Sequence, residues 1–583
     1  MKHTTFQPLF VVFFLILTAL ILWPGLSGPY IYDDHKNLAP LLEEEASYKT
    51  AIFENKAGPF GRGFTMATFA FNHWLKGELI PYDLKLTNLL LHLFNGCLLY
   101  WLLYFLLKIK FNNKKSNTYA LLITVFWLLN PVNTGVVFYV IQRATLLSMA
   151  FMLVSCLVYV YLRSRERQFN LYTLFLLFIC IISWILGILS KENAILLPFI
   201  ILCIELCFFD KFEIDKLNKN NMITISFIII STLFITIAAL YNSGYLDYSE
   251  RKFTLAERLY TQPVVISLYL QEILLPQSVD VSLYRNDDLQ IRKTIWNFAS
   301  ISSLLLIIIL ITFSCLSLKS NKYKYIGAGI LIYFTGHLIE STIFPLELFF
   351  RHRNYFPSFG LYLTLILLID RVLTTERIRK IFLFVSILYC LLLTSFSFVQ
   401  AKVWSSYDLI LLNAIEKHPD AMGGYLTIIG ELLNRKDLSS SLSISSSIIL
   451  ARPEYSLPIK IQRFYAYCKL ATDIPENEYQ ILERDLNLYN PELISLSFTN
   501  LLDSYSNNQC DFIDIERIVG NFTGWADQQL LSGNYTTEEL WYTEYYMVEF
   551  LLLLGKRNKA IERLNLHIKH GNSKALYFKE SMF

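Results

Sequence analysis

Long apolar runs separated by short polar connections constrain the fold of this chain more than any other feature. The first run, residues 9–26, is long enough to cross a bilayer as a helix, and similar runs recur up to residue 399. Because 54% of the residues are hydrophobic, the chain is too apolar for a soluble protein. We therefore predict an all-α bundle that crosses the membrane about eleven times. The predicted spans are residues 9–26, 84–107, 119–129, 146–162, 171–189, 194–209, 222–240, 295–316, 325–339, 359–369 and 381–399.

Lysine and arginine residues are concentrated in alternate connections, at residues 108–115, 163–167, 211–219, 319–324 and 371–380. Short basic loops face the cytoplasm, so the other connections and all residues after 400 are predicted to be extracytoplasmic. The lipid bilayer is thus one partner. The net charge of +3 comes from scattered residues, which gives no reason to expect nucleic acid as another partner.

The composition changes after residue 400, which predicts two domains: a membrane domain (1–400) and an extracytoplasmic α-helical domain (401–583). In the second domain, Pro419, Pro453 and Pro491 separate apolar residues that recur at helical spacing. Paired helices closed by proline are typical of tetratricopeptide-type repeats, so we expect a repeat-like domain that holds an acceptor or partner. A domain that only packs on the membrane part is the alternative. Its two cysteines, Cys468 and Cys510, would face an oxidising compartment, although the sequence does not decide whether they pair.

Two adjacent carboxylates, Asp33 and Asp34, follow the first span within the stretch YIYDDH. Neighbouring carboxylates cannot both ionise freely beside lipid, so one tends to stay protonated while the other can accept a proton or hold a metal. The alternative is a solvated acidic flank after a signal anchor. Further polar residues that are unusual in apolar sequence fall on the same predicted face. They are Arg62, His92, Gln142, Arg143, Lys191, Glu192, Asp287, Asp288, His337, Glu340, Glu347, Arg351, His352 and Arg353.

The predicted position of these residues restricts the substrate. ATP and nucleotide sugars are cytoplasmic, so an enzyme on the outer face needs a substrate that is already energised there. A lipid-linked phosphosugar is the obvious candidate. The cations Arg143, Lys191, Arg351 and Arg353 have the chemistry that binds its phosphate.

Several motifs occur in a fixed order after the first span. They are the acidic pair, GRGFT (61–65), LTNLLLHLFN (86–95), NPV (130–132), QRATLL (142–147), LSKENA (189–194), ERLYTQP (257–263), LLP (274–276), DD (287–288), HLIESTIFPLE (337–347) and HRNYFP (352–357). This order, over roughly residues 1–420, resembles the GT-C superfamily of polyprenyl-phosphate-dependent glycosyltransferases. The nearest branches are the O-mannosyltransferases with tetratricopeptide repeats and their bacterial relatives, which include pilin glycosyltransferases.

The resemblance implies a transferase of the bacterial inner membrane that moves a sugar from polyprenyl phosphate to a hydroxyl of an extracytoplasmic protein, such as a pilin. One aspartate, Asp33 slightly before Asp34, would be the general base, and cations or a divalent metal would neutralise the leaving phosphate. The chain departs from the family at two positions. Thr145 stands where the eukaryotic branch has an aspartate, and Arg351 stands where an acidic residue is expected.

Alternatives stay open for several of these residues and for the function. Lys191 beside Glu192 can be a self-neutralising ion pair, Asp287-Asp288 a solvated turn, and His92 and His337 packing histidines, since no zinc-binding spacing accompanies them. Arg62, Glu340 and His352 are further site candidates. A transferase of the same fold that acts on a glycolipid or a cell-surface polysaccharide is one alternative function. A transporter or assembly scaffold is another, although the halves of the chain show no internal symmetry.

Overall fold

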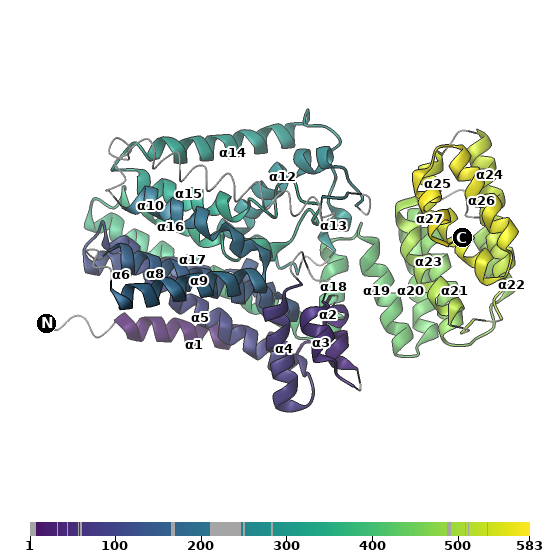
Figure 1. The fold of residues 1–583 in the computed structure, drawn as a ribbon, viewed down its shortest axis with the longest axis horizontal. Coiled ribbons are helices and arrows are strands. Elements are labelled where there is room, and N and C mark those ends of the chain that lie inside the picture. The colour runs from purple at the N-terminus through teal and green to yellow at the C-terminus, as the bar shows by residue number, and fades with distance from the viewer. Residues whose placement is uncertain are drawn as a thin grey trace. The chain divides into compact units, whose positions relative to one another are not determined.

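The computed structural model describes residues 7–582, except residues 32, 44, 56, 57, 59, 60, 165–169, 210–245, 249, 250, 282, 283, 485, 487–490, 508, 511, 533 and 534. Every regular element in these residues is a helix, as predicted (Figure 1). The chain divides into two compact units, Met1–Asn413 and Ala414–Phe583. The last long helix of the first unit extends past residue 400, where the sequence placed the domain boundary.

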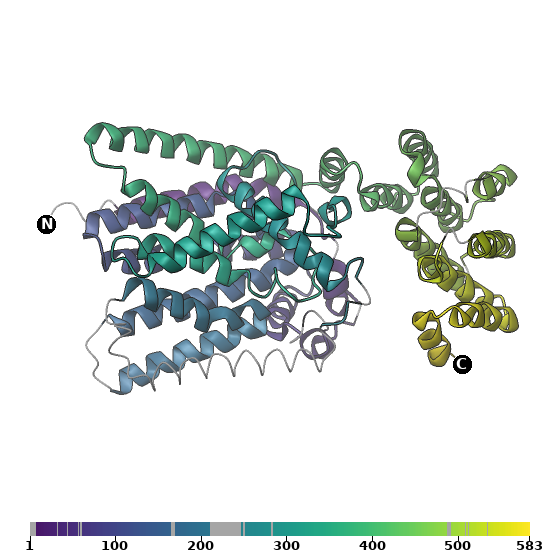
Figure 2. The same cartoon turned by 90° about the horizontal axis from the view of Figure 1, so that it is seen from above.

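The first unit is a bundle whose long helices run alongside one another (Figures 1 and 2). Its elements are α1 (Gln7–Leu22), η1 (Trp23–Ser27), α2 (Asp33–Leu42), α3 (Tyr48–Phe53), α4 (Gly63–Lys76), α5 (Pro81–Lys108), α6 (Asn113–Leu128), η2 (Pro131–Asn133), α7 (Thr134–Phe138), η3 (Val140–Gln142), α8 (Arg143–Arg163), α9 (Leu171–Ser190), η4 (Glu192–Leu196), α10 (Leu197–Phe208), α12 (Leu255–Leu274), α13 (Arg285–Asp288), α14 (Phe298–Ser317), α15 (Lys324–Gly336), η5 (Arg351–Asn354), α16 (Ser358–Asp370), α17 (Glu376–Trp404) and α18 (Tyr407–Lys417), the last of which continues into the second unit.

Within the described residues, six helices are long and apolar enough to cross a membrane, which makes this a membrane protein by the length and composition of its helices. They are Leu9–Ser27, Pro81–Lys108, Val140–Arg163, Leu171–Ser190, Phe298–Ser317 and Glu376–Trp404. The pair Asn113–Leu128 and Pro131–Phe138, bent by 55°, adds a seventh if it is one span.

The predicted count of about eleven spans is therefore not confirmed. Three predicted spans correspond to α10, α15 and α16, which have 12, 13 and 13 residues and are shorter than a straight crossing requires. A fourth, residues 222–240, lies outside the described residues.

Small residues let neighbouring helices of the bundle approach closely. At the contact between α15 and α16, a Cβ atom on Gly329 would collide with the carbonyl oxygen of Gly360, and a Cβ on Gly360 would collide with that of Gly329. In lipid, where apolar contacts between helices gain little over contacts with lipid tails, such backbone-to-backbone packing is a main source of helix association. The two glycines therefore fix how α15 lies against α16.

Three of the basic connections meet at one end of the bundle. Lys110 and Arg371 both donate to the carbonyl oxygen of Lys322, and Lys115 forms an ion pair with Asp370 at 2.6 Å. The short helices α2, α3 and α4 lie at the opposite end (Figure 1). This arrangement agrees with the alternation of basic loops, while the side of the membrane on which each end lies stays a prediction.

A reporter fused after Lys115 is expected to read cytoplasmic, and one fused after Trp404 is expected to read extracytoplasmic, because basic loops are retained inside. Alkaline phosphatase and green fluorescent protein fusions measure the two sides independently. A cytoplasmic reading after Trp404 would place α2 and the second unit on the wrong side for the predicted chemistry.

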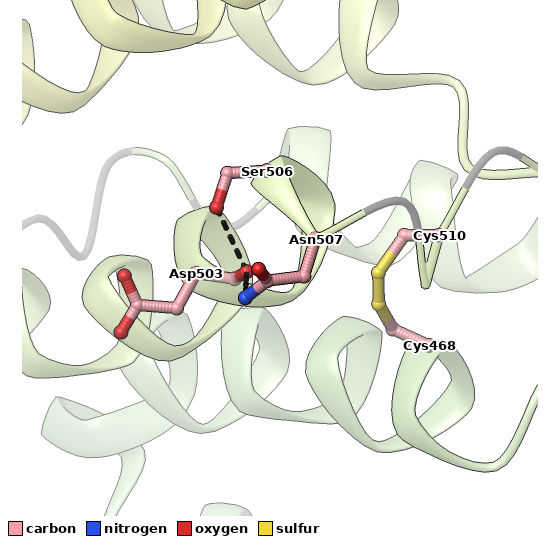
Figure 3. Close-up of a disulfide and its surroundings, with 5 residues drawn as sticks. All are labelled: Cys468, Asp503, Ser506, Asn507 and Cys510. Carbon is pink, nitrogen blue, oxygen red and sulfur yellow. Dashed lines mark hydrogen bonds between the residues drawn. A yellow bond between two sulfur atoms is a disulfide. The ribbon is translucent and has the colours of Figure 1, made fainter.

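The second unit is made of helices around its own apolar core, which includes Phe498, Phe522 and Phe550. A disulfide joins Cys468 of α21 to Cys510 after α23, with 5.0 Å between the two Cα atoms (Figure 3). The repeat-like architecture stays a prediction. The elements are α19 (Met422–Asn434), α20 (Leu438–Ala451), η6 (Pro453–Tyr455), α21 (Ser456–Lys469), α22 (Glu476–Arg484), α23 (Pro491–Ser506), α24 (Ile515–Ser532), α25 (Thr537–Leu553), α26 (Arg557–Lys569) and α27 (Ser573–Met582).

Candidate functional site

A cluster of charged side chains forms where four distant segments of the first unit meet. Lys191, at the end of α9, binds Glu340 with 3.1 Å between Nζ and Oε1, and the Lys191 ammonium also donates to Thr145 Oγ1 at 3.1 Å. Arg62, which precedes α4, donates from Nη2 to Glu192 Oε1 at 2.9 Å. The structure thus brings these sequence-predicted residues together, and Lys191 pairs with Glu340 rather than with its neighbour Glu192.

His352 and Arg353, in η5, complete this cluster, which we call the ionic cluster (Arg62, Lys191, Glu192, Glu340, His352 and Arg353). Burial alone would raise the pKa of the Glu340 carboxyl group, but the charges of Lys191 and Arg353 outweigh burial and lower it. Glu340 is therefore an anion. Burial holds the pKa of His352 well below its usual range, so its imidazole is neutral.

Arg353 differs from the other cations of the ionic cluster because it has no carboxylate within ion-pair distance among the described residues. Its side chain is buried, and its one hydrogen bond in this part of the structure runs from Nη1 to the carbonyl oxygen of Leu348 at 3.1 Å. A guanidinium that no carboxylate neutralises can bind an anion through its remaining donors. The position of Arg353 therefore favours a negatively charged ligand.

The backbone at Arg62 is strained. Arg62 has φ 50° and ψ 36°, which is the left-handed region, and Gly61 before it has φ 68°. A non-glycine residue there costs roughly 1–2 kcal/mol. The Arg62 side chain is thus held toward Glu192 at the expense of a relaxed backbone.

The two adjacent aspartates have different environments. Asp34 is 0% exposed, and its carboxylate accepts hydrogen bonds from the backbone N–H groups of Ile31 at 3.1 Å and Ile141 at 2.8 Å. Asp33, in contrast, is exposed at the start of α2 and lies near enough to Arg62 to interact with its charge. Asp34 thus joins α2 to η3, and Asp33 presents a carboxylate to solvent beside the ionic cluster.

The buried carboxyl group of Asp34 predicts a pH effect on stability. Burial raises its pKa to about 7, although the N–H groups of Ile31 and Ile141 and the charge of Lys85 oppose this shift. Between about pH 4 and pH 7 the folded protein keeps a proton that the unfolded chain has lost, so stability falls as pH rises through this window, by about 4 kcal/mol.

Thermal unfolding of the detergent-solubilised protein at pH 5 and pH 8 measures this effect. Asp34→Asn should be less stable at pH 5, because its amide cannot accept both N–H groups, and it should lose the pH dependence. An equal change in stability between pH 5 and pH 8 for the natural protein and Asp34→Asn would contradict the assignment of the pH effect to Asp34.

Two of the arginines predicted to bind phosphate are already occupied by acceptors within the protein. Arg143 donates to Asn88 Oδ1, Asn72 Oδ1 and the carbonyl oxygen of Leu84 at 2.6–3.1 Å. Arg351 donates from Nε to Glu272 Oε2 at 2.8 Å and lies 3.3 Å from Asp280 Oδ2. The structure brings neither guanidinium to the ionic cluster with free donors, so both join helices instead.

The histidines His92 and His337 lie inside the bundle with both ring nitrogens in hydrogen-bond contact. His92 contacts Tyr355 Oη at 2.8 Å and the carbonyl oxygen of Leu128 at 3.3 Å. His337 contacts Ser341 Oγ at 3.1 Å and Asn354 Oδ1 at 3.2 Å. These contacts fit the packing interpretation.

The predicted acidic element Asp287-Asp288 ends α13, and its side chains are outside what the structure describes. In the described part of the chain, no group of three or more His, Cys, Asp or Glu side chains is arranged to hold a metal ion.

Sequence reasoning missed several charged residues around the site. Glu272 and Asp280 bind both Arg351 and Arg285, beside a pocket of about 120 Å³ that includes Gln271 and Ser278 in its lining. Arg351 and Glu272 are 79 positions apart, so no local pattern could pair them. Arg258 lies within a motif that the sequence did single out, but its role depends on a loop more than 80 positions away.

No known protein-family model, curated protein or solved structure matches this chain. Function therefore has to be inferred from the chemistry of the ionic cluster and Asp33.

Proposed function

We propose that the protein is a membrane glycosyltransferase that moves a sugar from a polyprenyl-phosphate carrier to a hydroxyl group of an extracytoplasmic protein, such as a pilin. The strongest support is Arg353, a buried cation with no carboxylate within ion-pair distance among the described residues. Arg353 belongs to the same ionic cluster as Arg62, and Asp33 lies close enough to Arg62 to interact with its charge. An anion-binding group and an exposed carboxylate near one another are what this reaction requires.

In the proposed reaction, Asp33 accepts the proton of the acceptor hydroxyl while the oxygen of that hydroxyl forms a bond to the anomeric carbon of the sugar. The bond between that carbon and the phosphate oxygen breaks, and polyprenyl phosphate leaves with the electron pair. Arg353 stabilises the charge on the leaving phosphate. Lys191 and Arg62 are largely neutralised by Glu340 and Glu192, so they shape the site more than they add charge to it. No step uses a metal.

The second unit is proposed to lie outside the cytoplasm and to hold the acceptor protein. Its Cys468–Cys510 disulfide supports this location, because disulfides persist in oxidising compartments and are rare in the cytosol. In a bacterial cell this would place the unit on the outer side of the inner membrane.

Transfer of radiolabel from a polyprenyl-phosphate-linked sugar tests the proposal. Membranes that contain the protein should transfer label to protein-bound material, and membranes without it should not. Label that appears only in solvent-extractable lipid or in polysaccharide would favour the alternative acceptors. Absence of transfer to any of these, from mono- and diphosphate carriers alike, would overturn the proposed function.

Arg353→Ala is expected to weaken donor binding by about 10- to 100-fold, because a charge-assisted hydrogen bond to phosphate is lost. Arg353→Lys should recover part of this, since it keeps the charge but not the planar fork. Arg371→Ala, at the opposite end of the bundle, is the matched control. Binding of a lipid-linked donor to purified protein measures the effect, and equal affinities for the alanine variants would contradict a phosphate role for Arg353.

A further inference from the structure

The segment between α15 and η5, residues 337–350, is irregular, and we call it the 337–350 loop. It carries Glu340 of the ionic cluster and leads directly to His352 and Arg353. Much of it is buried, including Glu340 at 3% exposure and Phe349 at 0%. Backbone hydrogen bonds within the loop, such as that from the N–H group of Ser341 to the carbonyl oxygen of His337 at 3.0 Å, satisfy only some of its polar groups, so the others need different partners.

Three side chains of α12 supply these partners. Arg258 donates from Nε to the carbonyl oxygen of Thr342 at 2.7 Å, from Nη2 to that of Glu340 at 2.8 Å, and from Nη1 to that of Leu346. Gln262 Nε2 donates to the carbonyl oxygen of Leu348 at 3.1 Å, and Tyr269 Oη accepts from the N–H group of Phe350 at 2.7 Å. The spacing of 4 and 7 residues places all three on one face of the helix.

Arg258 makes the largest contribution among these side chains. It is 0% exposed, and its guanidinium reaches three carbonyl oxygens spread over residues 340–346. A lysine ammonium also has three donors, but they diverge from one atom on a flexible stem and do not match a planar set of acceptors. The position therefore requires the guanidinium group itself, and not only a positive charge.

We infer that Arg258 is a positioning residue that holds the 337–350 loop so that Glu340 meets Lys191 and η5 presents Arg353 to the ligand. Its importance for transfer rests on the proposed function, whereas its effect on the loop does not. Without Arg258, three carbonyl groups lose their donor, and the loop opens more often. Lys191 then loses its carboxylate partner and becomes accessible to solvent.

Chemical labelling of Lys191 tests this inference without any assay of activity. The purified full-length protein is pulsed with a water-soluble amine-acylating reagent, and modification at Lys191 is measured by mass spectrometry. In the natural protein Lys191 is 2% exposed and should react slowly. In Arg258→Lys and Arg258→Gln it should react at least about tenfold faster, because local opening governs access to a buried amine.

Arg251→Gln is the matched control. Arg251 binds the same loop through Glu347, but this ion pair is partly exposed to solvent, with its side chains at 31% and 41%. Exposed ion pairs contribute little, so labelling of Lys191 should change by less than about twofold. The thermal unfolding midpoint is measured in parallel, because a local effect of Arg258 should raise labelling at temperatures where the protein stays folded.

Two results would overturn the inference: unchanged Lys191 labelling in folded Arg258 variants, or an equal increase in the Arg251 variant. If the Arg258 variants do not accumulate, Gln262→Leu carries the same test, because it removes one hydrogen bond to the loop and should raise labelling to a smaller extent. In transfer assays, Arg258→Lys should lower kcat although lysine keeps the positive charge, because lysine cannot reproduce the three hydrogen bonds of the guanidinium. Loss of transfer in every assay together with the expected labelling would refute the proposed function and leave the positioning role intact.

Discussion

Asp33→Asn is expected to slow sugar transfer at least about a hundredfold while donor binding stays unchanged. Asparagine keeps the size and much of the hydrogen bonding of aspartate, but it cannot accept the proton of the acceptor hydroxyl. Because Asp33 is exposed, the substitution should leave folding intact. Single-turnover transfer with saturating donor separates the loss of the chemical step from any change in binding.

Asp83→Asn is the matched control for this experiment. Asp83, at the start of α5, is partly exposed and binds Lys76 at 2.5 Å, so it is a solvent-accessible carboxylate with no ion pair to the ionic cluster among the described residues. Its variant should transfer sugar at nearly the normal rate. Near-normal transfer by Asp33→Asn as well would reduce the aspartate pair to an acidic flank and would remove the proposed base.

Glu340→Leu is expected to destabilise the protein by about 3–5 kcal/mol, because it leaves the charge of Lys191 buried without a partner. The two side chains are only 5% and 3% exposed, so water cannot replace the lost carboxylate. The double variant Lys191→Met with Glu340→Leu removes both charges and should regain most of this stability. The double variant should not regain sugar transfer, because Arg353 loses its electrostatic interaction with the nearby Glu340 carboxylate.

Thermal or denaturant unfolding in one detergent measures these stabilities. Glu54→Leu is the control, since Glu54 binds Lys49 at 3.4 Å in a pair that is 52% and 82% exposed, and exposed pairs contribute less than about 1 kcal/mol. A double variant no more stable than Glu340→Leu alone would mean that the ion pair has no special role in stability.

The helical, membrane-spanning nature of the chain could be predicted because it depends on the length and composition of local segments. The number of spans could not, since residues 194–209 and 325–339 are apolar enough for spans but form helices that end early. Residues 255–274, assigned to a polar connection, form α12 inside the bundle. Such a helix combines polar and apolar faces, and hydropathy averages over both.

Several residues of the candidate site could be named from the sequence, but their contacts could not. Asp33 and Asp34 are neighbours in sequence, yet one is exposed and the other buried, because successive residues of a helix face different directions. Arg351 and Arg353 have the same chemistry. Only tertiary contacts show that Glu272 and Asp280 bind Arg351, whereas Arg353 has no carboxylate within ion-pair distance among the described residues. Sequence identifies ionisable residues, whereas their availability depends on distant partners.

The disulfide of the second unit makes its stability depend on location. Cys468 and Cys510 are 42 positions apart, and closing a loop of that length removes unfolded-state entropy equivalent to about 4 kcal/mol. Cytosolic glutathione and thioredoxin keep thiols reduced, so in the proposed extracytoplasmic location the bond would form only after the unit has crossed the membrane. A copy retained in the cytoplasm would lack the disulfide, so its second unit would unfold more readily and be degraded by proteases sooner. Export would then act as a maturation step, and only correctly delivered molecules would persist.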